Sequence, residues 1–300
     1  MKKATAIIMS LSLVGVLAAG CGSSNSSSPS ASPAASAPAS SAPASSAPAA
    51  SGKYADGVYY AQADTFDAST GWKEAVGLKV EGGKITSVNW TGMNKDGGID
   101  KKQYSLDGRY GMKAKGKASA EWHEQAAKAE KFLVEKQDPA AIKYNAEGKS
   151  DAIAGVSVHV NGLATLADKA LKAGPVKAGT YKDGTYKAEG AVDASSGWKD
   201  TVTLTVLDGK IFAVEWNGIH KDGGTDKKTR SREGKYGMKA GGASSEWHEQ
   251  ALKAEQYLLE KQNPDDIKVA ADGKTDAISG VSIHVNGFTE LAKKALSQAK

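Results

Sequence analysis

Two serines of this 300-residue chain, Ser157 and Ser282, stand in nearly identical surroundings. The first lies in the stretch SDAIAGVSVHVNG and the second in TDAISGVSIHVNG, 125 residues (282 − 157) further along the chain. Each serine comes shortly before an apolar pattern that is typical of a helix. A helix N-terminus presents unpaired N–H groups and positive partial charge, which favour a phosphate, and a hydroxyl at that place can serve as the attachment point of one.

An aspartate and a glycine precede each serine at fixed distances, in the pattern D-x-x-x-G-V-S. The simplest interpretation of a serine before a helix is an N-cap. A cap explains the serine but not the aspartate and glycine in the same register, so both interpretations stay open at the level of the residues. The candidate site residues are Asp151, Gly155 and Ser157 in the first copy, and Asp276, Gly280 and Ser282 in the second.

The chain after residue 52 is a tandem repeat. The segment 67–102 matches 193–228, and every tryptophan of one copy has a counterpart in the other. Each copy is long enough for a domain with a single core, so we expect one domain at 53–174 and a second at 179–300. The paired tryptophans are Trp72 with Trp198, Trp90 with Trp216, and Trp122 with Trp247.

Strand signals come first in each copy and helix signals follow. The stretch VTLTVLDGKIFAVEW alternates around Asp208–Gly209, which predicts a β-hairpin, and Gly82–Gly83 takes that place in the first copy. The stretch SAEWHEQAAKAEKFLVEKQDP predicts a helix that ends before Pro139, and a last helix is expected from VSVHVNGLATLADKALKA. This order predicts an α+β fold, with a small antiparallel sheet and helices in each domain. The expected buried face of the first of these helices consists of Trp122, Ala126, Ala129 and Leu133.

The N-terminus predicts export and a lipid anchor. A basic start is followed by an apolar stretch at 6–16, too short to cross a bilayer, and by VLAAGC, which resembles the lipobox of bacterial lipoproteins. We expect a signal peptide at 1–20, acylation of Cys21, and a position on the extracellular face of the cell membrane. Residues 21–52 are rich in Ser, Ala and Pro and contain no aromatic and no charged residue, which predicts a disordered tether.

Charge and cysteine content exclude several classes of protein. Without Lys2 and Lys3, 37 of the 39 basic residues remain against 34 acidic ones, a balance that does not indicate a nucleic-acid partner. Cys21 is the only cysteine, so the domains hold no disulfide, no Cys-ligated iron–sulfur cluster and no C-x-x-C-H haem site. Redox chemistry in the domains would need another carrier.

The serine pattern resembles the attachment motif D-x-x-[ST]-G-A-[TS] of the FMN-binding domain family, which includes the C subunit of the Na⁺-translocating NADH:quinone reductase. In that family a Mg²⁺-dependent flavin transferase uses FAD to esterify FMN phosphate to the last residue of the motif. The resemblance implies FMN on Ser157 and Ser282, with Asp151 and Asp276 recognised by the transferase or placing its metal.

Three positions depart from the family motif, and the overall layout extends the resemblance. Val156 and Val281 replace the alanine, and Ala154 replaces the hydroxyl residue in the first copy. A lipobox, a tether and two such repeats are similar to the two-domain FMN-binding lipoproteins of Gram-positive flavin-based extracellular electron transfer. That resemblance implies an electron carrier more than an enzyme, although a reductase activity toward soluble acceptors would follow. The implied partners are the flavin transferase, a membrane quinol or NADH-dehydrogenase-linked donor, extracellular acceptors such as ferric iron, and the lipid bilayer.

Other motifs that occur in both repeats are weaker candidates for a functional site. The stretch EWHEQA lacks the second histidine of H-E-x-x-H, because position 127 is alanine, so it is not a zinc protease motif. The stretch KDGG-x-DKK is no P-loop; it is a surface turn or a loop that lines a flavin. For the remaining pairs we expect a structural role more than a contact with the flavin ring or its phosphate. These pairs are Trp90 and Trp216, Trp122 and Trp247, His123 and His248, Met112 and Met238, and His159 and His284.

An alternative from another class remains open. In it the repeats form a tethered module without redox activity that binds an envelope polymer or a peptide, and the two serines are helix caps. Flavin absorbance after co-expression with a flavin transferase would separate the two functions.

Overall fold

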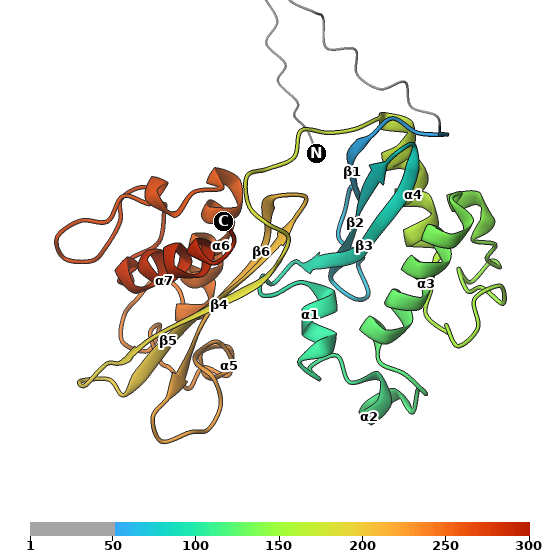
Figure 1. Cartoon of the computed structure of the whole chain (residues 1–300). Coiled ribbons are helices and arrows are strands. Elements are labelled where there is room, and N and C mark those ends of the chain that lie inside the picture. The colour runs from blue at the N-terminus through green and yellow to red at the C-terminus, as the bar shows by residue number, and fades with distance from the viewer. Residues whose placement is uncertain (1–51) are drawn as a thin grey trace, which may run out of the picture. The chain divides into compact units, whose positions relative to one another are not determined.

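The computed structural model describes residues 52–300, coloured from blue to red in Figure 1. The expected signal peptide, the acylated Cys21 and all but the end of the expected tether lie outside this range. The described elements fall into two sets of the same kind, one before and one after the segment 174–179. The α+β fold predicted for both repeats is confirmed.

The first repeat forms an antiparallel sheet in the order β1-β2-β3. Its strands are consecutive in the chain, and its helices follow them. The elements are β1 (Gly57–Gln62), β2 (Trp72–Glu81), β3 (Lys84–Asn94), α1 (Lys101–Leu106), α2 (Met112–Gly116), α3 (Trp122–Lys136), the 3₁₀ turn η1 (Pro139–Ala141) and α4 (Asn161–Ala173).

The second repeat has the same order of strands, β4-β5-β6, in a sheet of its own. Its segment equivalent to α2 forms turns instead of a helix. The elements are β4 (Gly184–Val192), β5 (Trp198–Leu207), β6 (Lys210–His220), α5 (Lys227–Arg232), α6 (Trp247–Lys261), the 3₁₀ turn η2 (Pro264–Asp266) and α7 (Asn286–Ser297).

Both predicted hairpins are confirmed, with two-residue turns between the strands. Gly82 and Gly83 have φ of 59° and 71°, and Asp208 and Gly209 have φ of 53° and 76°. Left-handed values at both central residues belong to the tight turns whose twist matches that of the strands, and they explain the glycines and the aspartate found there.

The core of each repeat lies between the sheet and its two long helices. In the first repeat α3 packs on β3, and α4 packs on β1 and β2; α6 and α7 take these places in the second (Figure 1). The buried face predicted for α3 is confirmed, because Trp122, Ala126, Ala129 and Leu133 are all at most 2% exposed. A fifth buried residue on that face, Gln125, is polar and was not predicted.

The ends of the long helices are fixed by side chains. Glu121 begins α3 with a capping box, in which its side chain and that of Glu124 each accept a hydrogen bond from the other's backbone N–H. Gln137 ends α3 in a left-handed conformation. Its amide side chain accepts from Ile85 N (2.7 Å) and donates to Ile85 O (2.8 Å), which ties the helix end to the hairpin. Gln262 does the same at the end of α6.

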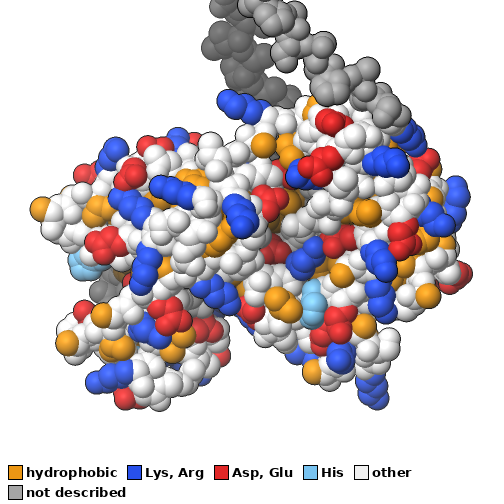
Figure 2. Space-filling view, viewed as in Figure 1, with side chains coloured by type: hydrophobic (Ala, Val, Ile, Leu, Met, Phe, Trp, Pro, Cys, Tyr) orange, Lys and Arg blue, Asp and Glu red, His pale blue; other side chains and the backbone are white. Residues whose placement is uncertain are grey.

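Charged side chains of both signs are interspersed over the visible face of the molecule (Figure 2). Among the residues that the structure describes, none of the helices combines the length and the apolar character that a bilayer crossing requires.

Candidate functional site

The serine motif forms a tight loop ahead of the last helix of each repeat. Gly155 and Gly280 both have φ of 72°, a left-handed conformation that residues with a Cβ rarely adopt. A Cβ on either glycine would also collide with a lysine amino group, Lys128 Nζ at Gly155 and Lys253 Nζ at Gly280. The tight backbone expected at the two glycines is confirmed.

Neither serine is a helix cap. In the first repeat α4 begins at Asn161, four residues after Ser157, and the N-cap is Val160, which makes no side-chain cap hydrogen bond. Val160 N donates to Gly148 O, so the chain is tied to the preceding turn before the helix can start. Ser282 stands in the same relation to α7. The interpretation of the serines as N-caps is therefore wrong, although each serine does lie near the start of the last helix, as expected.

A buried glutamine holds each serine instead. Gln125 Oε1 accepts from Ser157 N (2.6 Å), Ser157 Oγ (3.1 Å) and Val158 N (3.2 Å). Gln250 Oε1 accepts from Ser282 N at 2.7 Å and from Ser282 Oγ at 3.2 Å. Both glutamines are at most 1% exposed. One oxygen with these donors fixes the backbone of the serine and orients its hydroxyl, while the serine itself stays exposed.

The motif aspartates lie on the surface of the loop. Asp151 and Asp276 are both exposed, and Asp276 is not among the residues that line the pocket described below. Their carboxylates are accessible to a second protein but do not contribute to the wall of the pocket.

Ser282 lies on the wall of a pocket of about 1240 Å³ within the second repeat. The pocket is lined by aromatic side chains from β5, β6, α6 and the loop that precedes α6. A planar aromatic ligand would find aromatic rings there, together with polar groups that make up more than half of the exposed lining. The aromatic wall consists of Trp198, Trp216, Tyr236 and Trp247, and the exposed polar residues of the lining include Asp272, Lys274, His284 and Glu290.

The aromatic wall is held by ring-to-ring packing. Trp216 lies 5.1 Å from Trp247, nearly perpendicular to it, and stacks on Phe288 at 4.9 Å between centroids. Trp90 and Trp122 repeat the first of these contacts at 5.1 Å in the first repeat. These rings are almost fully buried, so the packing of the core fixes their positions, including those of Trp216 and Trp247 in the wall of the pocket.

The loop that carries Tyr236 and Met238 is tied to the start of α6. Glu246 accepts hydrogen bonds from the backbone N–H of Met238 (3.2 Å) and of Lys239 (3.1 Å). Met238 packs against the core and also lines the pocket, so it has both of the roles considered from the sequence.

The histidines separate into two kinds. The ring of His123 pairs with Ser105 Oγ at 3.0 Å and that of His248 with Ser231 Oγ at 2.9 Å, which joins α1 to α3 and α5 to α6. Burial, with Arg232 nearby, lowers the pKa of His248 below its ordinary value. His159 and His284, by contrast, are both exposed, and His284 lines the pocket, so the interpretation of this pair as partly buried structural histidines is wrong.

The KDGG-x-DKK stretch contains both of the features considered for it. Lys221 to Gly224 are exposed, as a surface turn requires. Lys227, three residues further on, starts α5, is 9% exposed and lines the pocket. Lys101 is its counterpart in the first repeat and is 7% exposed.

Sequence reasoning missed the glutamines and these two lysines. A signal for the glutamines existed, because Gln125 and Gln250 recur on the helix face predicted to be buried, where a polar side chain needs a partner. The lysines gave no comparable signal, since a lysine beside an aspartate and glycines is typical of a solvated turn.

Comparisons with known proteins show a family without naming a ligand. No family model matches the chain, and no curated protein is significantly similar to it. A Clostridium thermocellum protein with a solution NMR structure is 55% identical over 39% of this chain and 90% of its own, with a TM-score of 0.32. A Clostridium perfringens protein with a crystal structure is 28% identical over 40% and 88%, with a TM-score of 0.32.

The matched share of this chain is about the length of one repeat. At 55% identity over nine tenths of the Clostridium thermocellum protein, the chain belongs to the same family as that protein. The descriptions of both relatives name no ligand and no activity. The fold and the site define a pair of α+β domains. In each domain a buried glutamine holds a solvent-exposed serine, and in the second domain that serine lines an aromatic pocket.

Proposed function

We propose that the chain is a surface-anchored flavoprotein that carries FMN esterified to Ser157 and Ser282 and passes electrons to extracellular acceptors. The observation that carries this proposal is the position of Ser282, whose hydroxyl lies on the wall of an aromatic pocket and is oriented by Gln250. An attachment residue has to be reachable by a second protein and close to the place where its cofactor packs.

The residues of the pocket fit FMN. The isoalloxazine ring would pack against the aromatic wall of Trp198, Tyr236 and Trp247, which offers the ring faces and edges that flavins favour. The phosphate on Ser282 would lie among exposed lining residues that include Lys274 and His284. Trp216 Nε1 is a buried donor with no partner among the described residues, so the wall holds a polar atom that the protein does not satisfy.

The attachment step follows from the resemblance to the FMN-binding domain family. The serine Oγ forms a bond to the FMN phosphorus of FAD, the phosphoanhydride bond breaks, AMP leaves and the hydroxyl gives up its proton. In that step Gln125 and Gln250 hold the hydroxyl in place, and the exposed Asp151 and Asp276 are the groups that the transferase would recognise. Once bound, the flavin supplies the redox chemistry, and the protein holds it and sets the charges around it.

The location and partners of the carrier rest on the N-terminal sequence. Acylation of Cys21 would hold the two domains at the outer face of the membrane, where a quinol-linked donor supplies electrons and ferric iron or another soluble compound accepts them. An ester bond keeps the cofactor from diffusing away from the cell, which a dissociable flavin would do.

The test is the intact mass of the mature domains after co-expression with a flavin transferase, beside Ser157→Ala and Ser282→Ala. We expect a gain of two FMN units, with one unit lost in each variant. A wild-type chain without added mass, under conditions that modify a known acceptor domain, would refute the proposal and favour the binding module. A gain of one unit, lost only in Ser282→Ala, would show that Ala154 leaves the first repeat unmodified.

A further inference from the structure

Lys227 brings a positive charge into the aromatic wall of the pocket. Its Nζ lies 4.5 Å from the ring centroid of Trp247, 5.7 Å from that of Tyr236 and 6.0 Å from that of Trp198. Its ion-pair partner is Asp200 Oδ1, at 3.4 Å. All five side chains line the pocket that holds Ser282. Removing an ammonium group from water is costly, so a lysine kept here with a single carboxylate at 3.4 Å as its ion-pair partner is an unusual feature of the wall.

The first repeat has the same arrangement with its polar groups satisfied. Lys101 Nζ lies 4.5 Å from the ring centroid of Trp122 and donates to Glu74 Oε1 at 3.0 Å. The other oxygen of that carboxylate, Glu74 Oε2, accepts from Trp90 Nε1 at 3.4 Å. One glutamate therefore occupies both donors of the wall.

At the position of this carboxylate the second repeat differs from the first by one methylene group. Asp200 stands at the position of Glu74, third in its strand, and reaches only the lysine, at a longer distance. Trp216 Nε1, the counterpart of Trp90 Nε1, has no acceptor among residues 52–300. The second repeat thus leaves an indole N–H unpaired and an ammonium group only loosely paired.

The shorter side chain also leaves more room at the start of the last helix. A Cβ placed on Gly162 would collide with Glu74 Oε2, whereas the same Cβ on Gly287 would lie 3.2 Å from Asp200 Oδ2. Asp200 and Gly287 both line the pocket. Space and incompletely paired donors therefore occur together in the pocket that Ser282 also lines.

We propose that the exchange of Glu74 for Asp200 makes the second repeat the one that favours reduced FMN, so that its flavin has the higher midpoint potential. This inference rests on the proposed function. Two-electron reduction of the flavin ring adds two electrons and one proton, so the reduced ring carries one more negative charge than the oxidised ring. A cation that is only loosely paired with its carboxylate, and an N–H donor that has no acceptor among the described residues, stabilise that charge. Electrons on the chain would then pass from the first repeat to the second.

The test is a redox titration of single-flavin chains, followed by flavin absorbance. Ser157→Ala leaves the flavin of the second repeat, and Ser282→Ala leaves that of the first. We expect the second flavin to have the higher potential. Asp200→Glu should lower it and Glu74→Asp should raise that of the first repeat, each by about tenfold in the preference for the reduced form, or about 30 mV for a two-electron couple.

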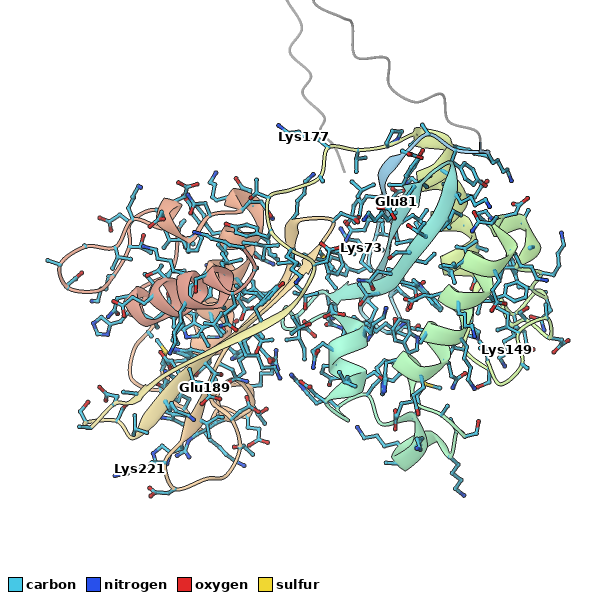
Figure 3. The ribbon with its side chains drawn as sticks, in the orientation of Figure 1. Lys73, Glu81, Lys149, Lys177, Glu189 and Lys221 are labelled. Atoms are coloured by element: carbon cyan, nitrogen blue, oxygen red, sulfur yellow. The ribbon has the colours of Figure 1, made fainter. Side chains whose placement is uncertain are left out.

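Two further variants complete the design. Lys227→Met removes the cation and should lower the potential of the second flavin at least as far as Asp200→Glu. Lys221→Met removes an exposed lysine from the loop after β6 (Figure 3) and should leave it unchanged. If Asp200→Glu does not fold, Lys227→Met still tests whether the wall of the pocket sets the potential of the second flavin.

The outcomes separate this inference from the proposed function. Chains without added FMN mass would overturn both. Chains that carry FMN but show equal potentials in the two repeats, or potentials unmoved by Asp200→Glu and Lys227→Met, would overturn the inference and leave the proposed function standing.

Discussion

A lysine–glutamate pair joins a short helix to a long one in each repeat, but the two pairs differ in solvent exposure. Lys228 and Glu255, between α5 and α6, have side chains 2% and 1% exposed. Lys102 and Glu130, between α1 and α3, have side chains 29% and 12% exposed. In both repeats the glutamate also accepts from the backbone N–H of the wall tryptophan, at 2.6 Å.

The difference between these ion pairs runs opposite to the difference in the pocket. The second repeat buries its ions more completely, whereas its wall donor Trp216 Nε1 lacks the acceptor that Trp90 Nε1 has. Two copies with one backbone plan can therefore differ in how many polar groups they satisfy internally. We expect the stability of the second repeat to depend more on its buried ion pair than the stability of the first repeat depends on its own pair.

Breaking the buried pair should give the largest effect. Lys228→Met leaves Glu255 as an uncompensated buried charge and should destabilise the second repeat by about 3–5 kcal/mol. Lys102→Met should cost the first repeat about 1–2 kcal/mol, because water reaches that pair. Hydrogen exchange followed by mass spectrometry measures the two repeats separately in the full chain, through peptides from α6 and α3.

The same variant has a pH dependence with a definite sign. Burial raises the pKa of Glu255 above its ordinary value, while Lys228 opposes this rise. Without the lysine the carboxyl takes up a proton more readily, so the loss in Lys228→Met should be largest at neutral pH and should shrink as the pH falls. Equal losses in the two repeats, or a loss that grows toward acid, would contradict the comparison.

Removal of the serine-holding glutamine should act equally on both repeats. Gln125→Leu and Gln250→Leu each leave two backbone N–H groups without their acceptor, one of them close to solvent, and should cost about 1–3 kcal/mol. Each variant should also reduce FMN incorporation at its own serine, read from intact mass at a fixed reaction time. An unequal loss of stability would show that the two loops are not held in the same way.

Asp208 provides the smallest test, since its counterpart is Gly82. Burial raises the pKa of Asp208 from 3.8 to about 7; Asp183 adds to the rise and Lys210 opposes it. A carboxyl whose folded pKa is raised contributes stability below its unfolded pKa, near pH 4, and loses that contribution as the pH rises through 7.

Asp208→Asn should therefore stabilise the second repeat by about 1 kcal/mol at pH 8, since it removes a buried charge with an unpaired oxygen. Asparagine tolerates the φ of 53° found at this position. The gain should vanish near pH 4 in thermal unfolding measured across this range. A gain that persists at pH 4 would mean that charge is not its cause.

Much of the fold could be predicted because its signals are local. The hairpin at Asp208–Gly209 and the buried face of α3 follow from residue types at fixed spacing, and both are confirmed. The site could be predicted only in part, because the motif identified the serines but not the residues that surround them. Gln250, Lys227 and Asp200 come from three different elements, and their meeting depends on how α6, α5 and β5 pack together.

The serines themselves show where local rules fail. A serine a few residues before a helix is most often a cap, yet the helix starts later because Val160 is tied to Gly148 by a backbone hydrogen bond. A bond between residues that far apart in the loop has no signature in the spacing of apolar side chains.

Each sheet is assembled from three consecutive strands of its own repeat, and the helices that cover it come from that repeat as well. A copy made in this way has all the strands of its sheet once its own stretch of chain has been synthesised, and duplication of that stretch adds a whole sheet with its helices. The number of copies can therefore change in one genetic event, and each new copy is then free to diverge by single side chains, as Glu74 and Asp200 have done.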